Sequence, residues 1–131
     1  MTIIDRATRC FLGIQAVEER SQAIGQQLVN EAPAKQYYSD QFPLYDSLVY
    51  RQGYHLSLPD KSETYSVEGD NAELRHYLTR LVRWSRCFSR CLVWLNRHLK
   101  AFAHAWNQRQ LHNHAFPYDK KHVIDFVCLQ D

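Results

Sequence analysis

Residues 66–109 read SVEGDNAELRHYLTRLVRWSRCFSRCLVWLNRHLKAFAHAWNQR, and this stretch decides the fold prediction because its apolar and basic side chains separate at helical spacing. At about 100° per residue the apolar side chains fall in one broad sector, as in a helix that packs on a core. That sector contains Leu74, Tyr77, Leu78, Leu81, Trp84, Phe88, Leu92, Leu95, Leu99, Phe102, Ala103 and Trp106. The pattern predicts a helix that begins between residues 66 and 71 and runs to about 109, or two helices with a break near 85–89.

A narrow stripe of basic side chains lies on the opposite side of this predicted helix, and Glu68 projects onto it. The stripe consists of Arg75, Arg83, Arg86, Arg90, Arg97 and Lys100. Charge is also segregated along the chain: residues 1–73 carry six basic and eleven acidic side chains, whereas residues 74–118 carry eight basic and no acidic ones. Such segregation is typical of proteins that bind a polyanion, usually nucleic acid, although a solvated basic helix without a partner has the same pattern.

The residues before the helix alternate between strand and helix patterns. The apolar run 2–4, the polar turn 5–9 and the apolar stretch 10–17 predict a hairpin. The other predicted elements are a helix at 18–32 that ends at Pro33, a strand at 35–40, a short helix or turn at 41–50 and at most one strand near 54–58. This order favours the α/β class with a mixed sheet. After the basic helix, 110–118 is predicted to be a polar loop and 122–129 a short apolar strand or turn.

A chain of 131 residues with 45% hydrophobic and 23% charged residues fits one ordinary globular domain. We divide it into a mixed α/β part at 1–65, a basic helical part at 66–109 and a tail at 110–131. Its apolar runs are far shorter than the ~20 residues that a membrane span needs, so no membrane partner is expected. The N-terminal residues lack the pattern of a secretory signal, and the four cysteines are expected to be thiols rather than bridges.

Two acidic residues are the leading candidates for chemistry. Asp40 ends a predicted strand, where α/β sheets place functional groups, and Glu68 lies at the start of the basic helix. Two carboxylates brought together can hold Mg²⁺, and paired metal ions can activate the attacking oxygen and stabilise the leaving oxygen at a phosphodiester. The simpler alternative is that Asp40 caps a turn and that Glu68 is an ordinary acid at a helix N-terminus.

Four segments of the chain resemble a known family. Segments 65–81 (YSVEGDNAELRHYLTRL) and 86–90 (RCFSR) resemble the C-terminal signature of bacterial insertion-sequence transposases of the first insertion-element family. The family pattern there is (V/I)E-x-x-N-x-x-L-R, followed by a basic run that ends in CFS or SFS. Segment 38–45 (YSDQFPLY) resembles the family segment with the second catalytic Asp, and 4–9 (IDRATR) resembles its D-R-x-x-R hairpin turn. The resemblance covers roughly residues 3–110, and its most specific part extends from Glu68 to Phe88.

This resemblance implies a ribonuclease H-like fold, Mg²⁺ or Mn²⁺ as cofactor, and cutting and joining of DNA at the ends of an insertion element. Carried over by position, Asp40 is the second acid of the DDE triad and Glu68 the third. Asn71 and Arg75 match family positions beside the Glu, which implies a role in positioning it or the DNA. The implied partners are DNA and either a second copy or an upstream-encoded transposase segment, in the cytoplasm of a prokaryote at its nucleoid.

The chain departs from the family at the first triad Asp. In the family this Asp lies on a strand before the D-R hairpin, whereas here the sequence begins four residues before Asp5. We expect Asp5 to be a turn residue that bonds to the local backbone, because Asp favours that role, rather than the absent ligand. The first strand is therefore expected to be missing from the catalytic domain. We expect a fragile, association-prone chain, because the neighbouring strand would expose unpaired backbone.

Other interpretations stay open at this point. The chain could be a truncated, non-catalytic DNA-binding or assembly partner of a full transposase, or a decayed relic. Cys87 and Cys91 could form a zinc site with His112 and His114, but buried thiols are the preferred interpretation, because the spacing matches no common zinc motif. Trp94 projects near the basic stripe and is the aromatic side chain best placed to stack on a base.

Overall fold

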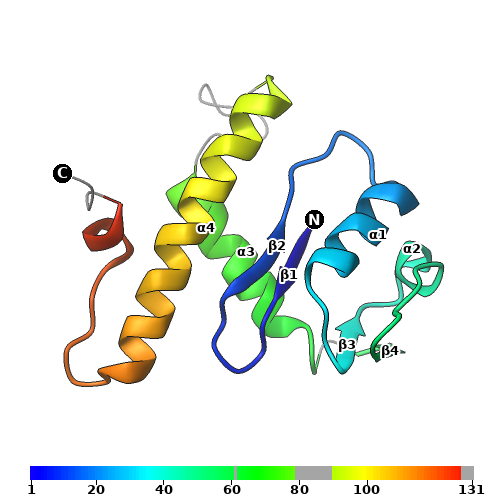
Figure 1. Cartoon of the computed structure of the whole chain (residues 1–131), viewed down its shortest axis with the longest axis horizontal. Coiled ribbons are helices and arrows are strands. Elements are labelled where there is room, and N and C mark those ends of the chain that lie inside the picture. Colours follow the sequence, from blue (N-terminus) through cyan, green and yellow to red (C-terminus); the bar gives the residue numbers. More distant parts are fainter. Residues whose placement is uncertain (61, 79–89, 128–131) are drawn as a thin grey trace.

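The structure is a computed structural model that describes residues 1–60, 62–78 and 90–127 (Figure 1). Its elements are, in chain order, β1 (Thr2–Ile4), β2 (Phe11–Ile14), α1 (Gln22–Glu31), β3 (Gln36–Ser39), α2 (Pro43–Asp46), β4 (Tyr54–Ser57), α3 (Tyr65–Tyr77), α4 (Leu92–Ala115) and the 3-10 helix η2 (Val123–Phe126). This arrangement confirms the predicted mixed α/β class.

The predicted N-terminal hairpin is present, and local hydrogen bonds fix its turn. β1 pairs antiparallel with β2, and a bulge shifts the register after Ile3. The Asp5 carboxylate accepts a hydrogen bond from the main-chain N–H of Thr8 at 2.8 Å, and the Asp5 N–H donates to the carbonyl of Cys10 at 2.8 Å. Arg9 completes the turn in the left-handed region with φ of 62°. The turn role predicted for Asp5 is confirmed.

Helices pack on both faces of the hairpin (Figure 1). α1 and α4 contact β2, and α3 contacts β1. The core between the hairpin, α3, α4 and η2 consists of Phe11, Leu74, Leu95, Leu99, Phe102, Ala103, Ala105, Trp106 and Val123. Six of these residues belong to the apolar sector that the helical spacing predicted. Two further members, Tyr77 and Leu78, are partly buried against the core.

Two asparagines of α4 bind the outer edge of β2. Asn107 accepts a hydrogen bond from the N–H of Phe11 at 2.7 Å and donates to its carbonyl at 2.8 Å. Asn96 accepts a hydrogen bond from the N–H of Ala16 at 2.8 Å and donates to the Ala16 carbonyl at 3.2 Å. A side-chain amide offers one donor and one acceptor in the geometry of a peptide group, so these residues stand in for a neighbouring strand. The main-chain groups of Phe11 and Ala16 are therefore bonded from within the chain.

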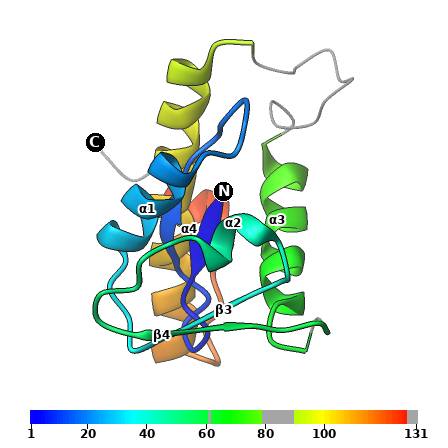
Figure 2. The same ribbon diagram turned by 90° about the vertical axis from the view of Figure 1, so that its right-hand side faces the viewer.

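The strand pair β3–β4 forms a second sheet. β3 and β4 run parallel, in register from Gln36 opposite Tyr54 to Ser39 opposite Ser57, and neither pairs with the hairpin. Figure 2 shows this pair running across the direction of β1 and β2. Gly53 enters β4 so close to the backbone of Ala34 that a Cβ would collide with the Ala34 carbonyl oxygen. The expectation of one mixed sheet was wrong, because pairing between distant strands is not encoded in local patterns.

The long basic helix is two helices. α3 ends at Tyr77, where Leu78 leaves the helical region, and α4 begins at Leu92 after the extended residue Cys91. The break predicted near 85–89 lies outside the described residues. α4 continues to Ala115, so the prediction of a loop at 110–118 was wrong for its first six residues. The helix ends two residues before Pro117, because proline disfavours helical backbone in the residue that precedes it.

Candidate functional site

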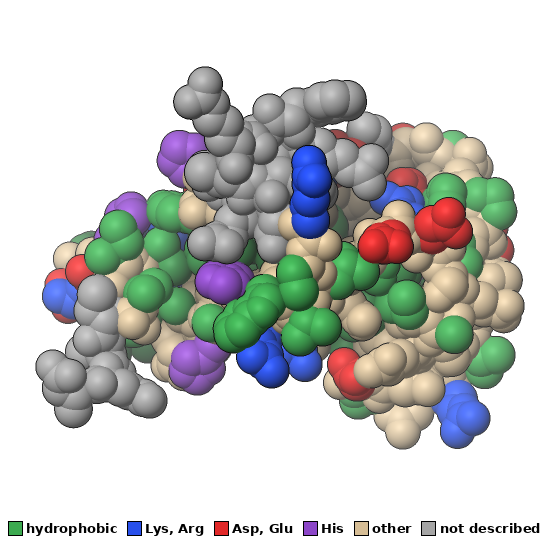
Figure 3. All heavy atoms as spheres, turned by 90° about the horizontal axis from the view of Figure 1, so that it is seen from above, with side chains coloured by type: hydrophobic (Ala, Val, Ile, Leu, Met, Phe, Trp, Pro, Cys, Tyr) green, Lys and Arg blue, Asp and Glu red, His purple; other side chains and the backbone are tan. Residues whose placement is uncertain are grey.

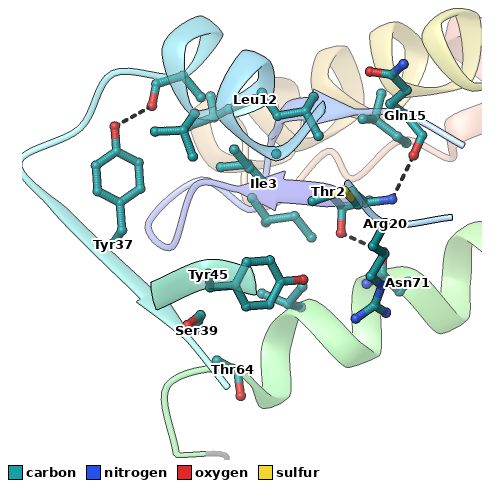
Figure 4. A pocket seen from close by; sticks show the side chains of 18 of the residues that line it. Thr2, Ile3, Leu12, Gln15, Arg20, Tyr37, Ser39, Tyr45, Thr64 and Asn71 are labelled. Carbon is teal, nitrogen blue, oxygen red and sulfur yellow. Dashed lines mark hydrogen bonds between the residues drawn. The ribbon is translucent and has the colours of Figure 1, made fainter. Parts of the chain in front are cut away.

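A cavity of about 1300 Å³ lies between the hairpin, α1, β3 and α3 (Figure 4). Both predicted catalytic acids line it: Asp40 follows the last residue of β3, and Glu68 lies in the first turn of α3. Asn71 and Arg75 of α3 line the same cavity, and so does Arg90. Residues from separate parts of the sequence therefore line one cavity.

Hydroxyl groups and a turn hold Asp40 in place. Its main-chain carbonyl accepts hydrogen bonds from the hydroxyl of Ser39 at 2.8 Å and from that of Ser57 at 3.3 Å. One carboxylate oxygen accepts from the N–H of Phe42 at 3.3 Å. The turn-capping interpretation of Asp40 is therefore confirmed. It does not compete with metal binding, because this turn uses only one of the two carboxylate oxygens and the side chain is exposed.

A buried ion pair fixes the helix turn that carries Glu68. Arg9 donates from Nε and Nη2 to the two carboxylate oxygens of Asp70, at 2.8 and 2.7 Å, and also to the carbonyl of Ser66 at 3.0 Å. Asp70 is 4% exposed, and its hydrogen bonds raise the pKa of Arg9 above the ordinary value. Ser66 and Asp70 flank Glu68 along α3, so the hairpin turn determines where Glu68 stands. The sequence analysis did not identify this pair.

Asn71 bonds to the hairpin. Its side-chain oxygen accepts a hydrogen bond from the hydroxyl of Thr2 at 3.1 Å, across the cavity wall in Figure 4. This contact ties α3 to β1 and supports a structural positioning role for Asn71. Direct positioning of Glu68 or of DNA, which the resemblance implied for Asn71, stays a prediction.

The basic stripe is divided between two helices. Arg75 on α3 and Arg90 before α4 line the cavity, whereas Arg97 and Lys100 are exposed on α4 outside it. The remaining members, Arg83 and Arg86, lie outside the described residues. A single continuous stripe was therefore the wrong geometry. In the view from above, most acidic side chains lie on the side of α1 and the histidines on the side of α4 (Figure 3).

Trp94 lies where the sequence predicted it, beside a basic residue. The guanidinium of Arg97 stacks over its ring at 4.7 Å from the centroid, and the Trp94 side chain is 56% exposed. An exposed tryptophan next to a cation offers a flat surface that bases can stack on. Cys91 is exposed, so the buried-thiol interpretation was wrong for this residue, while Cys87 lies outside the described residues.

The ligand set suits a hard cation with open positions. Mg²⁺ is usually held by one or two carboxylates together with waters and substrate phosphates. Asp40 and Glu68 supply two carboxylates to one cavity. Within the described ranges, no group of three or more His, Cys, Asp or Glu side chains could hold a metal ion. Asp5 also lines the cavity, and one of its carboxylate oxygens accepts hydrogen bonds from the N–H and the hydroxyl of Thr8. A complete three-acid site would need a further ligand.

A histidine next to Asp40 was not predicted. The Nε2 of His55 lies 2.8 Å from the Ser39 hydroxyl, its ring stacks on Tyr50 at 4.6 Å, and its Nδ1 is 3.7 Å from Asp46. The Ser39 hydroxyl also lies 2.8 Å from the Asp40 carbonyl, so it links His55 to the end of β3. Burial lowers the pKa of His55, and the charge of Asp46 opposes this shift. His55 therefore supports the end of β3 as a neutral side chain.

Acidification is expected to destabilise the protein through His55. Its pKa is lower in the folded chain than in the unfolded chain, so its stabilising effect is full above the unfolded value of about 6.5 and declines as pH falls below it. The free energy of unfolding, measured by urea denaturation at pH 7.5 and 5.5, should fall less in His55→Gln than in the wild type. His114→Gln, at an exposed histidine, is the control and should match the wild type. Equal pH dependence of the His55→Gln variant and the wild type would refute this role.

Comparisons with family models, curated proteins and solved structures gave no match. Among the described residues, no helix is both long enough and apolar enough to cross a membrane.

Proposed function

We propose that this chain is a catalytic-core segment of a DDE-type DNA transposase with a ribonuclease H-like fold. It would act in a prokaryotic cytoplasm, at the nucleoid, on the ends of an insertion element. One observation carries the proposal: Asp40 and Glu68, from different parts of the chain, line one cavity together with Arg75 and Arg90. Carboxylates next to guanidinium groups suit a phosphodiester accompanied by a divalent cation.

Each group has a defined task in this proposal. Asp40 and Glu68 hold Mg²⁺ or Mn²⁺, which when bound activates the attacking oxygen and stabilises the leaving oxygen. Arg75 and Arg90 bind the phosphates on either side of the scissile bond. In cleavage, a water oxygen bonds to phosphorus and the bond to the 3′ oxygen breaks, leaving a 3′ hydroxyl. In strand transfer, that hydroxyl attacks a phosphorus of the target DNA and displaces the target's own 3′ oxygen.

Binding of Mn²⁺ tests this assignment without relying on activity. Asp40→Asn and Glu68→Gln are each expected to weaken Mn²⁺ binding at least tenfold, since loss of an outer-shell partner alone typically costs about 10–100-fold. Electron paramagnetic resonance of free Mn²⁺ during titration measures the affinity. Glu73→Gln is the matched control, because Glu73 is exposed on the same helix and does not line the cavity. Wild-type affinity in both site variants would refute the metal site.

A second candidate function is DNA binding or assembly without catalysis. It is favoured by the exposed Trp94–Arg97 pair on α4 and by the lack of a third acidic ligand among the described residues. Under this alternative, DNA binding persists in Asp40→Asn, and the wild-type chain does not nick supercoiled plasmid in Mn²⁺. A metal-dependent nick that Asp40→Asn abolishes supports the transposase instead.

Both candidates predict DNA binding that weakens with salt. Each phosphate that a basic side chain neutralises contributes about −0.9 to the slope of log affinity against log salt concentration. Replacing both Arg97 and Lys100 with alanine should therefore reduce the slope by about 1.8, measured by fluorescence anisotropy with a duplex. Lys35→Ala, at an exposed lysine on the acidic half of the chain, should leave the slope unchanged. A flat salt response of the wild type would exclude the basic residues as a DNA contact.

A further inference from the structure

The two outer edges of the hairpin differ in the hydrogen bonding of their main-chain groups. Main-chain groups of Met1 and Asp5 bond to Gln15 and Cys10, which flank β2. The alternation of an antiparallel ladder therefore turns the N–H and C=O groups of Thr2 and Ile4 the other way. No hydrogen bond outside the hairpin joins these groups to another residue in the described ranges. Asn107 and Asn96 bond to the other outer edge at Phe11 and Ala16, whereas no side chain in the described ranges does this for Thr2 and Ile4.

The open edge of β1 faces the cavity, and so does a second open edge. Thr2 and Ile4 line the cavity. β3 directs alternate main-chain groups toward β4, as the bonds from Tyr54 and Leu58 show, which turns those of Gln36 and Tyr38 away. Gln36 and Tyr38 also line the cavity, and β3 pairs only with β4 among the described strands. Two sets of unpaired backbone groups therefore border the same space.

Apolar side chains line the cavity from both sides. α1 contributes Leu28, Val29 and Ala32. α3 and α4 contribute Leu74, Leu95 and Leu99. The space between these walls has a volume of about 1300 Å³ and is open to solvent, so it has room for a further segment of polypeptide. A strand that is buried on both faces typically consists of a nearly continuous run of Val, Ile and Leu residues, so a strand in this cavity would have that composition.

We propose that the cavity accepts one extended, apolar strand of a different polypeptide, which bonds through its main chain to Thr2 and Ile4. Strand addition to an open edge obtains affinity from main-chain hydrogen bonds and specificity from the side-chain pockets. The inserted strand would lie beside Asp40 and Glu68, so its biological meaning rests on the proposed function. This strand would be the partner that completes the site. The open edges and apolar walls that support it do not depend on metal or DNA binding.

Hydrogen exchange with a defined peptide tests the proposal. The probe is the synthetic peptide KKVIVVIVKK, and the control is KKVPVVPVKK, whose prolines prevent strand pairing. With the probe, the amide of Ile4 should exchange at least tenfold more slowly, measured by NMR on the full chain. The amides of Phe11 and Ala16 are internal controls, since asparagines already bind them. The proline peptide should change none of these rates.

Two results would overturn the inference. One is an Ile4 amide whose exchange the probe does not slow at saturating concentration. The other is an Ile4 amide already protected in the chain alone, with protection that disappears on dilution, because a second copy would then occupy the edge. Neither result would affect the Mn²⁺ titration of Asp40→Asn, so failure of the strand site and failure of the metal site are distinguishable.

Discussion

An Asp70→Asn variant is expected to lose about 1.5–3 kcal/mol of the free energy of unfolding, because it removes two charge-assisted hydrogen bonds between Arg9 and a buried carboxylate. The loss stays below that of a fully buried pair, since the Arg9 side chain is 37% exposed and water solvates its guanidinium in the variant. The wild-type pair is bidentate, with distances of 2.7 and 2.8 Å, and the Asp70 side chain is 6% exposed. Asparagine keeps the size of the side chain but supplies neither the charge nor the second acceptor. The hairpin turn and the start of α3 would separate, and Glu68 would lose its fixed position.

Urea denaturation followed by circular dichroism measures this loss. The matched control is Arg6→Gln, in the same turn, whose ion pair with Glu63 spans 2.6 Å but whose Arg6 side chain is 66% exposed. Exposed pairs contribute about 0–1 kcal/mol, so the control should remain close to the wild type. A loss of less than about 1 kcal/mol in Asp70→Asn would show that the pair does not hold the hairpin to α3.

An Asn107→Ala variant is expected to lose about 3 kcal/mol, since both the N–H and the carbonyl of Phe11 would lose their partner. A buried polar group without a hydrogen bond costs about 1–3 kcal/mol, and Phe11 is 5% exposed. The free energy of unfolding from urea denaturation is again the measure.

Asn113→Ala provides an unusually close control. Asn113 lies on the same helix and makes the same two bonds to a main chain, accepting from the N–H of Lys121 at 2.8 Å and donating to its carbonyl at 3.3 Å. Lys121 is exposed, so water replaces the lost bonds and the loss should stay below about 1 kcal/mol. Equal losses in the two variants would contradict the claim that α4 seals the edge of β2.

Local features of the fold were predictable because short-range chemistry determines them. Asp5 favours a turn, and alternating apolar residues give the hairpin strands. Helical spacing placed Leu74, Leu95 and Trp106 in the core, because a helix carries its phase reliably over a few turns. The backbone is not helical at Leu78 or at Cys91, so the helical spacing of α3 does not continue into α4. Cys91 was predicted to be buried and is exposed.

Long-range pairs were not predictable from one sequence. Arg9 and Asp70 are 61 residues apart, and Asn107 and Phe11 are 96 apart, so no periodic pattern links them. The pairing of β3 with β4, and its separation from the hairpin, depends on the same kind of distant contact. The candidate site was predictable in part: the resemblance singled out Asp40 and Glu68, but His55 beside Asp40 carries no sequence signal.

The central claim is that Asp40 and Glu68 serve one metal ion in one cavity. The most direct measurement is an NMR titration of the full chain with substoichiometric Mn²⁺, which broadens the amide signals of nearby residues. The account predicts that the signals of Gln41 and Gly69, adjacent to the two acids, broaden together at the same Mn²⁺ concentration, while that of the distant Asn113 stays sharp. Broadening at only one of the two acids, or at neither, would contradict it.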